Sequence, residues 1–248
     1  MFSQLKRSIA IAKKNLRIYY MKGPVIIFGI LLPFFFFLSF WMGRDIPAIV
    51  LGTGLVGMAI WFTSTSISPV ITPWETRTKT LERLVSSPVG IPTILLGDVL
   101  SSAFIGIVMT VVPLGIALVF LDLTLVHPLL FGLGILLASF CFSSIGVLMS
   151  SLPTDTPADV MMLSTLVKFP VIFISGIFIP IDNLPAWGET VSHLSPLTYF
   201  TQLARYSFGT EVSGQISPLV DLGALVVFTM IFMSAAVLLH RKTLPKRI

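Results

Sequence analysis

Residues 91–121 read IPTILLGDVLSSAFIGIVMTVVPLGIALVFL, and Asp98 is the single charged residue among them. An α-helix rises ~1.5 Å per residue, so about 20 apolar residues cross the ~30 Å hydrocarbon core of a bilayer. A water-soluble helix would carry polar residues along one face, and this stretch does not. We therefore predict a transmembrane helix at 91–121.

Further apolar runs of similar character lie on both sides of this helix, at 24–42, 46–71, 128–152, 160–181 and 218–240. Hydrophobic residues make up 55% of the 248 residues and charged residues only 11%, whereas a soluble domain has ~25% charged residues. Most of the surface must therefore face something other than water. The sequence predicts an all-α membrane protein with six transmembrane helices, forming one domain over 1–248.

The basic residues predict the orientation in the membrane. Of the 16 lysines and arginines, 13 precede the first span, lie between the second and third, or follow the sixth. With six spans these positions all fall on one side, and the positive-inside rule places that side and both termini in the cytoplasm. The net charge of +5 does not indicate nucleic-acid binding, because the basic residues cluster beside membrane spans rather than on a soluble face.

The first 22 residues predict an amphipathic helix on the membrane surface. Apolar residues recur there at helical spacing, with lysines and arginines elsewhere around the helix. The apolar positions are Leu5, Ile9, Ala12, Leu16 and Tyr19. An ordinary basic tail in the cytoplasm is the alternative.

The segment 72–89, between the second and third spans, predicts a short cytoplasmic helix. Thr72 is a capping residue, Pro73 suits the first helical position, and Glu75 can bond back to the amide of the cap. Pro88 ends the helix, because the residue before a proline is pushed out of helical geometry. One apolar face consists of Leu81, Leu84 and Val85. Such a helix, parallel to the membrane, offers a surface to a partner protein.

The outer segment 183–209, between the fifth and sixth spans, is too apolar for a plain loop. Asn183 and Ser195 each open a stretch with a proline near the start, and Gly209 is a plausible helix stop. Aromatic residues such as Trp187 and Tyr199 suit the membrane interface. We predict two short helices that dip back into the outer leaflet.

Few residues in the sequence indicate a catalytic, nucleotide-binding or metal-binding site. Residues 52–57 (GTGLVG) match the dinucleotide-binding pattern, but they lie inside a predicted span, where small residues allow close helix packing. There is no GxxxxGK[ST] phosphate-binding loop, and the histidines have no metal-binding spacing. We expect the chain to bind no cofactor or metal and to catalyse no reaction. The single Cys141 reads as a buried packing residue.

Lys168 lies well inside the fifth predicted span. A charge at that depth costs about 2.5–3.5 kcal/mol on insertion scales. It either faces a polar pathway or subunit interface, or snorkels to the cytoplasmic headgroups. The residue types leave both interpretations open.

Three motifs together resemble the permeases of type-2 ABC exporters. Residues 80–89 (TLERLVSSPV) resemble the signature after their second span, and 175–180 (SGIFIP) with a following proline and tryptophan resemble the exit of their fifth span. Residues 195–199 (SPLTY), with Arg205 beyond, are similar to their last outer helix. The motifs occur in the same order across nearly the whole chain. The chain departs from the family at Lys168 and at Gln202, near which an acidic residue is expected.

The resemblance implies a permease dimer, made of identical or closely related chains, in the plasma membrane. Two copies of a separate ATP-binding-cassette subunit, which hold the ATP and magnesium, would drive export of a drug-like, lipid-like or other amphipathic substrate. The implied coupling residues are Glu75, Arg77, Thr80, Leu81, Glu82, Arg83, Leu84 and Val85. The implied residues of the substrate path or dimer interface are Lys168, Ser175 and Phe178, and those of an outer gate are Pro180, Pro196 and Tyr199.

The alternative is a secondary transporter driven by an ion gradient. It would need intramembrane carboxylates and paired broken helices, and neither is evident in the sequence. A membrane-embedded enzyme would need a catalytic cluster near the water interface, and none is evident.

Overall fold

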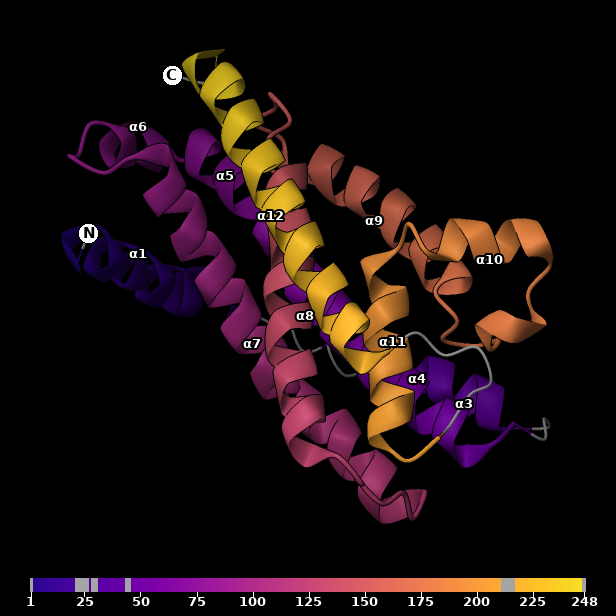
Figure 1. The fold of residues 1–248 in the computed structure, drawn as a ribbon. Helices are drawn as coiled ribbons and strands as arrows, with labels where there is room; N and C mark the ends of the chain where they lie inside the picture. The colour runs from indigo at the N-terminus through magenta and orange to yellow at the C-terminus, as the bar shows by residue number, and fades with distance from the viewer. Residues whose placement is uncertain (1, 21–26, 28–30, 43–45, 211–216, 247–248) are drawn as a thin grey trace.

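The computed structural model describes residues 2–20, 27, 31–42, 46–210 and 217–246, and every regular element in these ranges is a helix (Figure 1). The helices are α1 (Phe2–Asn15), η1 (Leu16–Tyr20), α3 (Leu32–Trp41), α4 (Ala48–Ser66), α5 (Ser68–Arg77), α6 (Thr80–Val85), α7 (Ile91–Phe120), α8 (Pro128–Met149), α9 (Pro157–Ile174), η3 (Ile181–Asn183), α10 (Ala186–Ser192), α11 (Pro196–Ser207), α12 (Pro218–Thr243) and η4 (Leu244–Lys246). The all-α prediction is confirmed for this part of the chain.

Within the described residues, five helical stretches are long and apolar enough to cross a membrane. They are α4 together with α5 (Ala48–Arg77), α7, α8, α9 and α12. The remaining predicted span, 24–42, is described at residue 27 and over 31–42, where α3 lies. The rest of that span lies outside the described residues, so a sixth transmembrane helix stays a prediction.

The long helices α7, α8 and α12 run alongside one another, and α1 crosses near the start of α7 (Figure 1). At one end of the molecule, which we call the α6 end, Arg7 bonds the carbonyl of Pro88 and Ser150 bonds His240 at 3.2 Å. At the opposite end, the amides of Val126 and His127 donate to the carbonyl of Ser207 at 2.9 and 3.0 Å. The first and last described helices therefore reach the same end.

The core lies around α4, which is buried along almost its whole length. The Trp61 ring on α4 meets Phe142 of α8 edge to face, with centroids 4.9 Å apart, and Phe142 meets Phe200 of α11 in the same way at 6.3 Å. Edge-to-face pairs of this kind add ~0.5–1.5 kcal/mol beyond burial of their area. Helices α4, α8 and α11 thus share one aromatic centre.

Glycines set how closely the helices approach. A Cβ added at Gly54 would lie 3.0 Å from the carbonyl oxygen of Ile177, and one at Gly146 would lie 1.9 Å from Oγ of Ser68. A side chain at Gly54 would press on the backbone of Ile177, and one at Gly146 would require the Ser68 hydroxyl to move. Gly54 of the GTGLVG pattern therefore lets α4 pack closely against the segment that follows α9.

Large apolar side chains cover the outside of the long helices. Val111 and Val119 on α7, and Leu219 and Met230 on α12, are exposed. Exposed apolar surface of this extent suits a lipid environment, because apolar side chains are unfavourable in water but not in hydrocarbon. The apolar runs of the sequence thus supply lipid-facing surface as well as core.

Candidate functional site

The helix predicted at 72–89 has a different course in the structure. Helix α5 begins at Ser68 and continues through Thr72 and Pro73, so the predicted helix start at Thr72 is wrong. Pro69 takes the first-turn position that the pattern assigned to Pro73. The helix then breaks at Lys79, which has a left-handed backbone (φ 54°), and α6 follows as a separate short helix.

Glu75 joins this segment to the N-terminal helix. Its carboxylate is almost fully buried and forms an ion pair with the ammonium of Lys14 on α1. Beside the pair, the rings of Trp74 and Tyr19 stack with centroids 5.5 Å apart and an interplanar angle of 11°. Burial, and then the negative charge of Glu75, raise the pKa of Tyr19, which therefore stays neutral. Glu75 is an inter-helix ion-pair partner here and not a capping residue.

The exposed face of α6 is polar. Thr80, Glu82 and Arg83 are exposed, whereas Leu81 is only 3% exposed and packs within the chain. Leu81 is therefore not available as an apolar anchor for a partner in this structure, contrary to the sequence-based expectation. The remaining predicted coupling residues divide between half-buried positions (Leu84, Val85) and an exposed one (Arg77).

Hydrogen bonds join helix α1 to the N-terminal turns of α7, and the sequence analysis did not predict them. Asn15 donates to Oδ1 of Asp98 at 2.6 Å, and both side chains are buried. About two turns toward the chain start, the Ser8 hydroxyl donates to the carbonyl of Thr93 at 2.9 Å. Asp98 is thus a buried partner of α1. A polar residue in each of two separate helices gives no sequence signal of pairing.

The long stretch Ala48–Arg77 is broken between α4 and α5 at Ile67. Pro69 cannot donate the helical hydrogen bond to residue 65, and its ring crowds that carbonyl. Hydroxyl groups at the break bond back to carbonyls one turn earlier: Thr65 to Trp61 at 2.6 Å and Ser68 to Ser64 at 3.1 Å. Such back-bonding bends helices. The break separates α4 from α5, which carries Glu75.

Lys168 lies in the interior of the bundle. It is 6% exposed, and it lines a small cavity between α9 and the end of α4, near Ser66. Leu166, two residues earlier on α9, is 70% exposed. This burial disfavours the snorkelling alternative, and a polar pathway or subunit interface at Lys168 stays a prediction.

The segment after α9 returns tightly to the bundle. Gly176 has a positive φ of 75°, and its carbonyl accepts a hydrogen bond from Arg205 of α11. The hydroxyl groups of Ser175 and Ser195 bond at 2.8 Å, which fixes the start of α11 against the end of α9. Two short helices, α10 and α11, occupy the predicted outer segment, and Gly209 (φ 87°) follows α11 as its stop.

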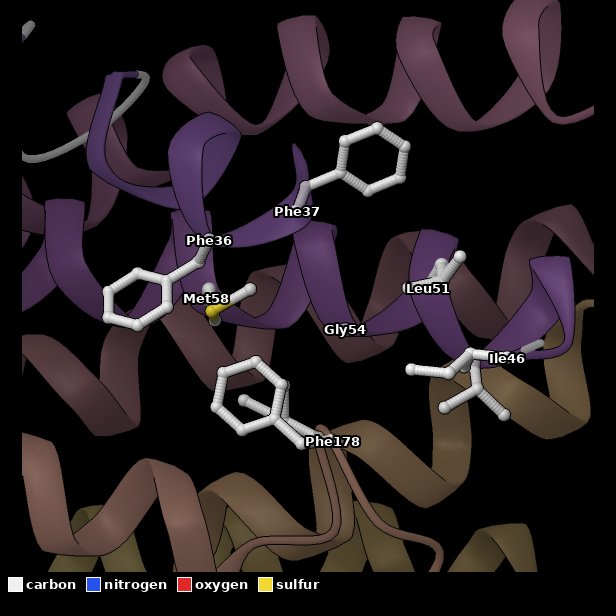
Figure 2. Close-up of a pocket in the computed structure, with 9 residues that line it drawn as sticks. Phe36, Phe37, Ile46, Leu51, Gly54, Met58 and Phe178 are labelled. Carbon is white, nitrogen blue, oxygen red and sulfur yellow. The ribbon is translucent and has the colours of Figure 1, made fainter. Parts of the chain in front are cut away.

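Two of the three predicted outer-gate residues help hold these helices. Pro196 is buried at the first turn of α11, and the Tyr199 hydroxyl donates to the carbonyl of His193 at 2.9 Å. The third, Pro180, is half-buried just before η3. The structure brings Phe178, but neither Pro196 nor Tyr199, to the apolar pocket between α3 and α4 shown in Figure 2.

The family model described as "ABC-2 type transporter" matches residues 4–209, which include the broken helix, the α6 segment and the return at Gly176. The chain belongs to the ABC-2 type transporter family. The resemblance predicted from the three motifs is confirmed, and so is a membrane protein that crosses the bilayer several times.

Among curated proteins, this ABC-2 family chain is 31% identical over 160 residues to "Inner membrane transport permease YadH" of Escherichia coli strain K12. The proteins of that name from Escherichia coli O157:H7 and Shigella flexneri show the same identity. The aligned region covers 62% of this chain and 59% of each relative, so it spans about three fifths of their length.

Proposed function

We propose that this chain is the permease subunit of an ATP-driven exporter in the plasma membrane, with the α6 end in the cytoplasm. Family membership supports a transport role, and the clustering of basic residues beside the α6 end supports the orientation. The sequence has no GxxxxGK[ST] loop. We propose that two copies of a separate ATP-binding-cassette subunit hydrolyse the ATP, and that two permease chains form the transport path.

The observation that carries the proposal is the attachment of Glu75 both to the broken span and to the N-terminal helix α1. Through α5 it continues into the broken span and so into α4, and through Lys14 it is paired to α1. Helix α1 is in turn bonded to the base of α7 through Asn15. A displacement of α6 by the ATP-binding subunit would therefore move three membrane-associated helices together.

The α6 surface supports an electrostatic docking step. Glu82 and Arg83 are exposed beside one another with opposite charges, and charged groups at the rim of an interface govern orientation and association rate more than affinity. The break at Ile67 gives α5 a place to change its angle relative to α4. In this mechanism the return at Gly176 and the short helices α10 and α11 close the outer side, with Pro180, Pro196 and Tyr199 in the gate.

The test is transport in proteoliposomes that contain the permease and its proposed ATP-binding-cassette subunit. We expect export of amphipathic compounds only with ATP and magnesium, inhibition by vanadate, and no ATPase activity from the permease alone. Transport that proceeds without ATP and stops when a protonophore removes the ion gradient would instead establish the secondary-transporter alternative. Robust ATP hydrolysis by the isolated chain would contradict the proposed division between subunits.

A further inference from the structure

The rotation of helix α1 about its own axis is fixed by its contacts with α7. Its buried face, on which each side chain is at most 8% exposed, consists of Ser8, Ile11, Ala12 and Asn15. Gly97 of α7 lets this face approach closely, because a Cβ there would lie 2.7 Å from Ile11 and 2.9 Å from the carbonyl oxygen of Ser8. The hydrogen bonds of Ser8 and Asn15 to α7 hold the same face. The contacts therefore also determine which side chains α1 turns away from the protein.

Helix α1 crosses α7 close to where the outside of α7 becomes apolar. Its hydrogen bonds reach Thr93 and Asp98, near the start of α7. The exposed large apolar side chains of α7 begin at Phe104, six residues or ~9 Å beyond Asp98. The Tyr19 ring, in the π-helix that continues α1, stacks on Trp74, and such aromatic side chains favour the membrane interface. In the proposed orientation, α1 thus lies at the level of the lipid headgroups.

Two groups of exposed side chains lie on the outward surface of α1. Leu5 and Ile9, which we call the apolar row, are 49% and 54% exposed, and they are the members of the apolar face expected from the sequence that stay exposed. Lys6, Lys13 and Arg17, which we call the basic row, are exposed as well. The rows are neighbours, because Ile9 and Lys13 are four residues apart on the helix. The outward surface therefore combines an apolar part with a cationic part.

The basic row has no acidic partner in the described part of the protein. Residues 1–44 contain no aspartate or glutamate. The ion pair that joins α1 to Glu75 uses Lys14, which lies outside the row. Lys13 and Arg17 are moreover like charges four residues apart, an arrangement that destabilises a helix when no counter-charge is present. The row is therefore complementary to anions supplied from outside the chain.

We propose that the basic row binds the headgroups of anionic phospholipids in the leaflet on the α6 side, while the apolar row enters the hydrocarbon beside them. The inference rests on the proposed function for the orientation, and it adds the class of lipid that the permease selects. Lysine and arginine form charge-assisted hydrogen bonds to phosphate oxygens, and basic residues close to an anionic leaflet are attracted to it. Because α1 is paired to α5, bound headgroups would also hold the end of the broken span at the membrane surface.

The test measures which lipid lies beside α1 in the full-length permease. Ile9 is replaced with cysteine and labelled with bimane, after the native Cys141 has been replaced with alanine. The protein is reconstituted in vesicles of phosphatidylcholine that contain one fifth phosphatidylglycerol. A nitroxide on the acyl chain of either lipid quenches bimane at short range, so the two quenching curves give the relative association of the two lipids with α1.

We expect phosphatidylglycerol to associate with α1 at least about fivefold more strongly than phosphatidylcholine. This ratio corresponds to ~1 kcal/mol, the gain of a single basic residue near an anionic surface. The preference should fall toward one in concentrated salt, because the Debye length shortens from ~10 Å at 0.1 M to ~3 Å at 1 M. No quenching by either lipid would show that α1 does not lie in the bilayer surface, and would overturn the inference.

Variants connect the preference to the basic row. Lys6→Gln with Lys13→Gln should lower the preference to less than about twofold, whereas Lys6→Arg with Lys13→Arg, which keeps both charges, should retain it. The matched control is Arg241→Gln with Lys242→Gln, because it removes two exposed cations near the end of α12 and should leave the preference unchanged. The same preference in both glutamine double variants, or none with the row intact, would overturn the inference. If the Lys6 and Lys13 variant instead loses only its association with the ATP-binding subunit, the row is a protein contact and the inference is wrong.

The quenching measurement needs neither ATP nor a partner protein, so its outcome is separate from that of the proposed function. ATP-driven export in proteoliposomes together with no lipid preference at α1 would refute the inference and leave the proposed function standing. A preference for phosphatidylglycerol that depends on the basic row, without any ATP-driven export, would refute the proposed function and leave the lipid contact established.

Discussion

Replacing Lys14 with Met should loosen α1 from the rest of the protein. Glu75 would keep its buried position, with a side chain 4% exposed, but would lose its cation. Breaking a fully buried pair costs about 3–5 kcal/mol, whereas an exposed pair is worth only ~0.2–1 kcal/mol. Because the Lys14 side chain is 32% exposed, water screens the pair in part, and we expect a cost of about 1.5–3 kcal/mol between these limits.

Hydrogen exchange of the α1 amides measures this cost locally. A tenfold change in an equilibrium constant corresponds to about 1.4 kcal/mol, so exchange over residues 2–20 should accelerate by about 10–100-fold. The matched control is Lys13→Met, because Lys13 is exposed and its replacement should change exchange by less than about threefold. The same Lys14 variant should lower substrate-stimulated ATP hydrolysis in the complex, since α1 would no longer follow α5.

The charge-swapped double variant Lys14→Glu with Glu75→Lys tests the ion pair itself. It restores opposite charges at the same two positions, so exchange should return toward the wild-type rate. Equal exchange in the Lys14 and Lys13 variants, or no recovery in the swapped variant, would show that the ion pair does not hold α1 in place.

Three further predictions concern topology, packing and docking. Reporter fusions after Pro88 and after Arg241 should both report the cytoplasm, and an external signal from either would break the proposed orientation. Gly54→Val should destabilise the protein by about 1–3 kcal/mol through overpacking, seen as labelling of the buried single Cys141 by a thiol-reactive dye at a lower temperature; an unchanged labelling temperature would count against close packing there. Leu81→Asp should lower the same labelling temperature, because Leu81 is buried. Arg83→Glu should leave the labelling temperature unchanged and slow association with the ATP-binding subunit in a salt-dependent way. If Leu81→Asp instead weakens association without lowering the labelling temperature, Leu81 is the anchor for the partner.

Patterns local in sequence predicted much of the fold. The apolar runs identified the helices that are long enough to cross a membrane, because hydrocarbon leaves a backbone no hydrogen-bond partners outside its own helix. Proline and glycine predicted the start of α11 at Pro196 and the stop at Gly209, since both act on the backbone of their own turn. The same local logic failed at Thr72, where two prolines four residues apart both suit a helix start and only Pro69 occupies it.

What the sequence determined by itself is therefore the class of protein, the helical runs and the family, each of which rests on composition, local backbone chemistry or motif order. Only the tertiary structure decided the partners of the polar groups: Glu75 with Lys14, Asp98 with Asn15, and Lys168 with a cavity. The first two pairs join residues 61 and 83 positions apart in the chain. Periodicity places each side chain on a face of its own helix, but packing in three dimensions chooses which other helix that face meets.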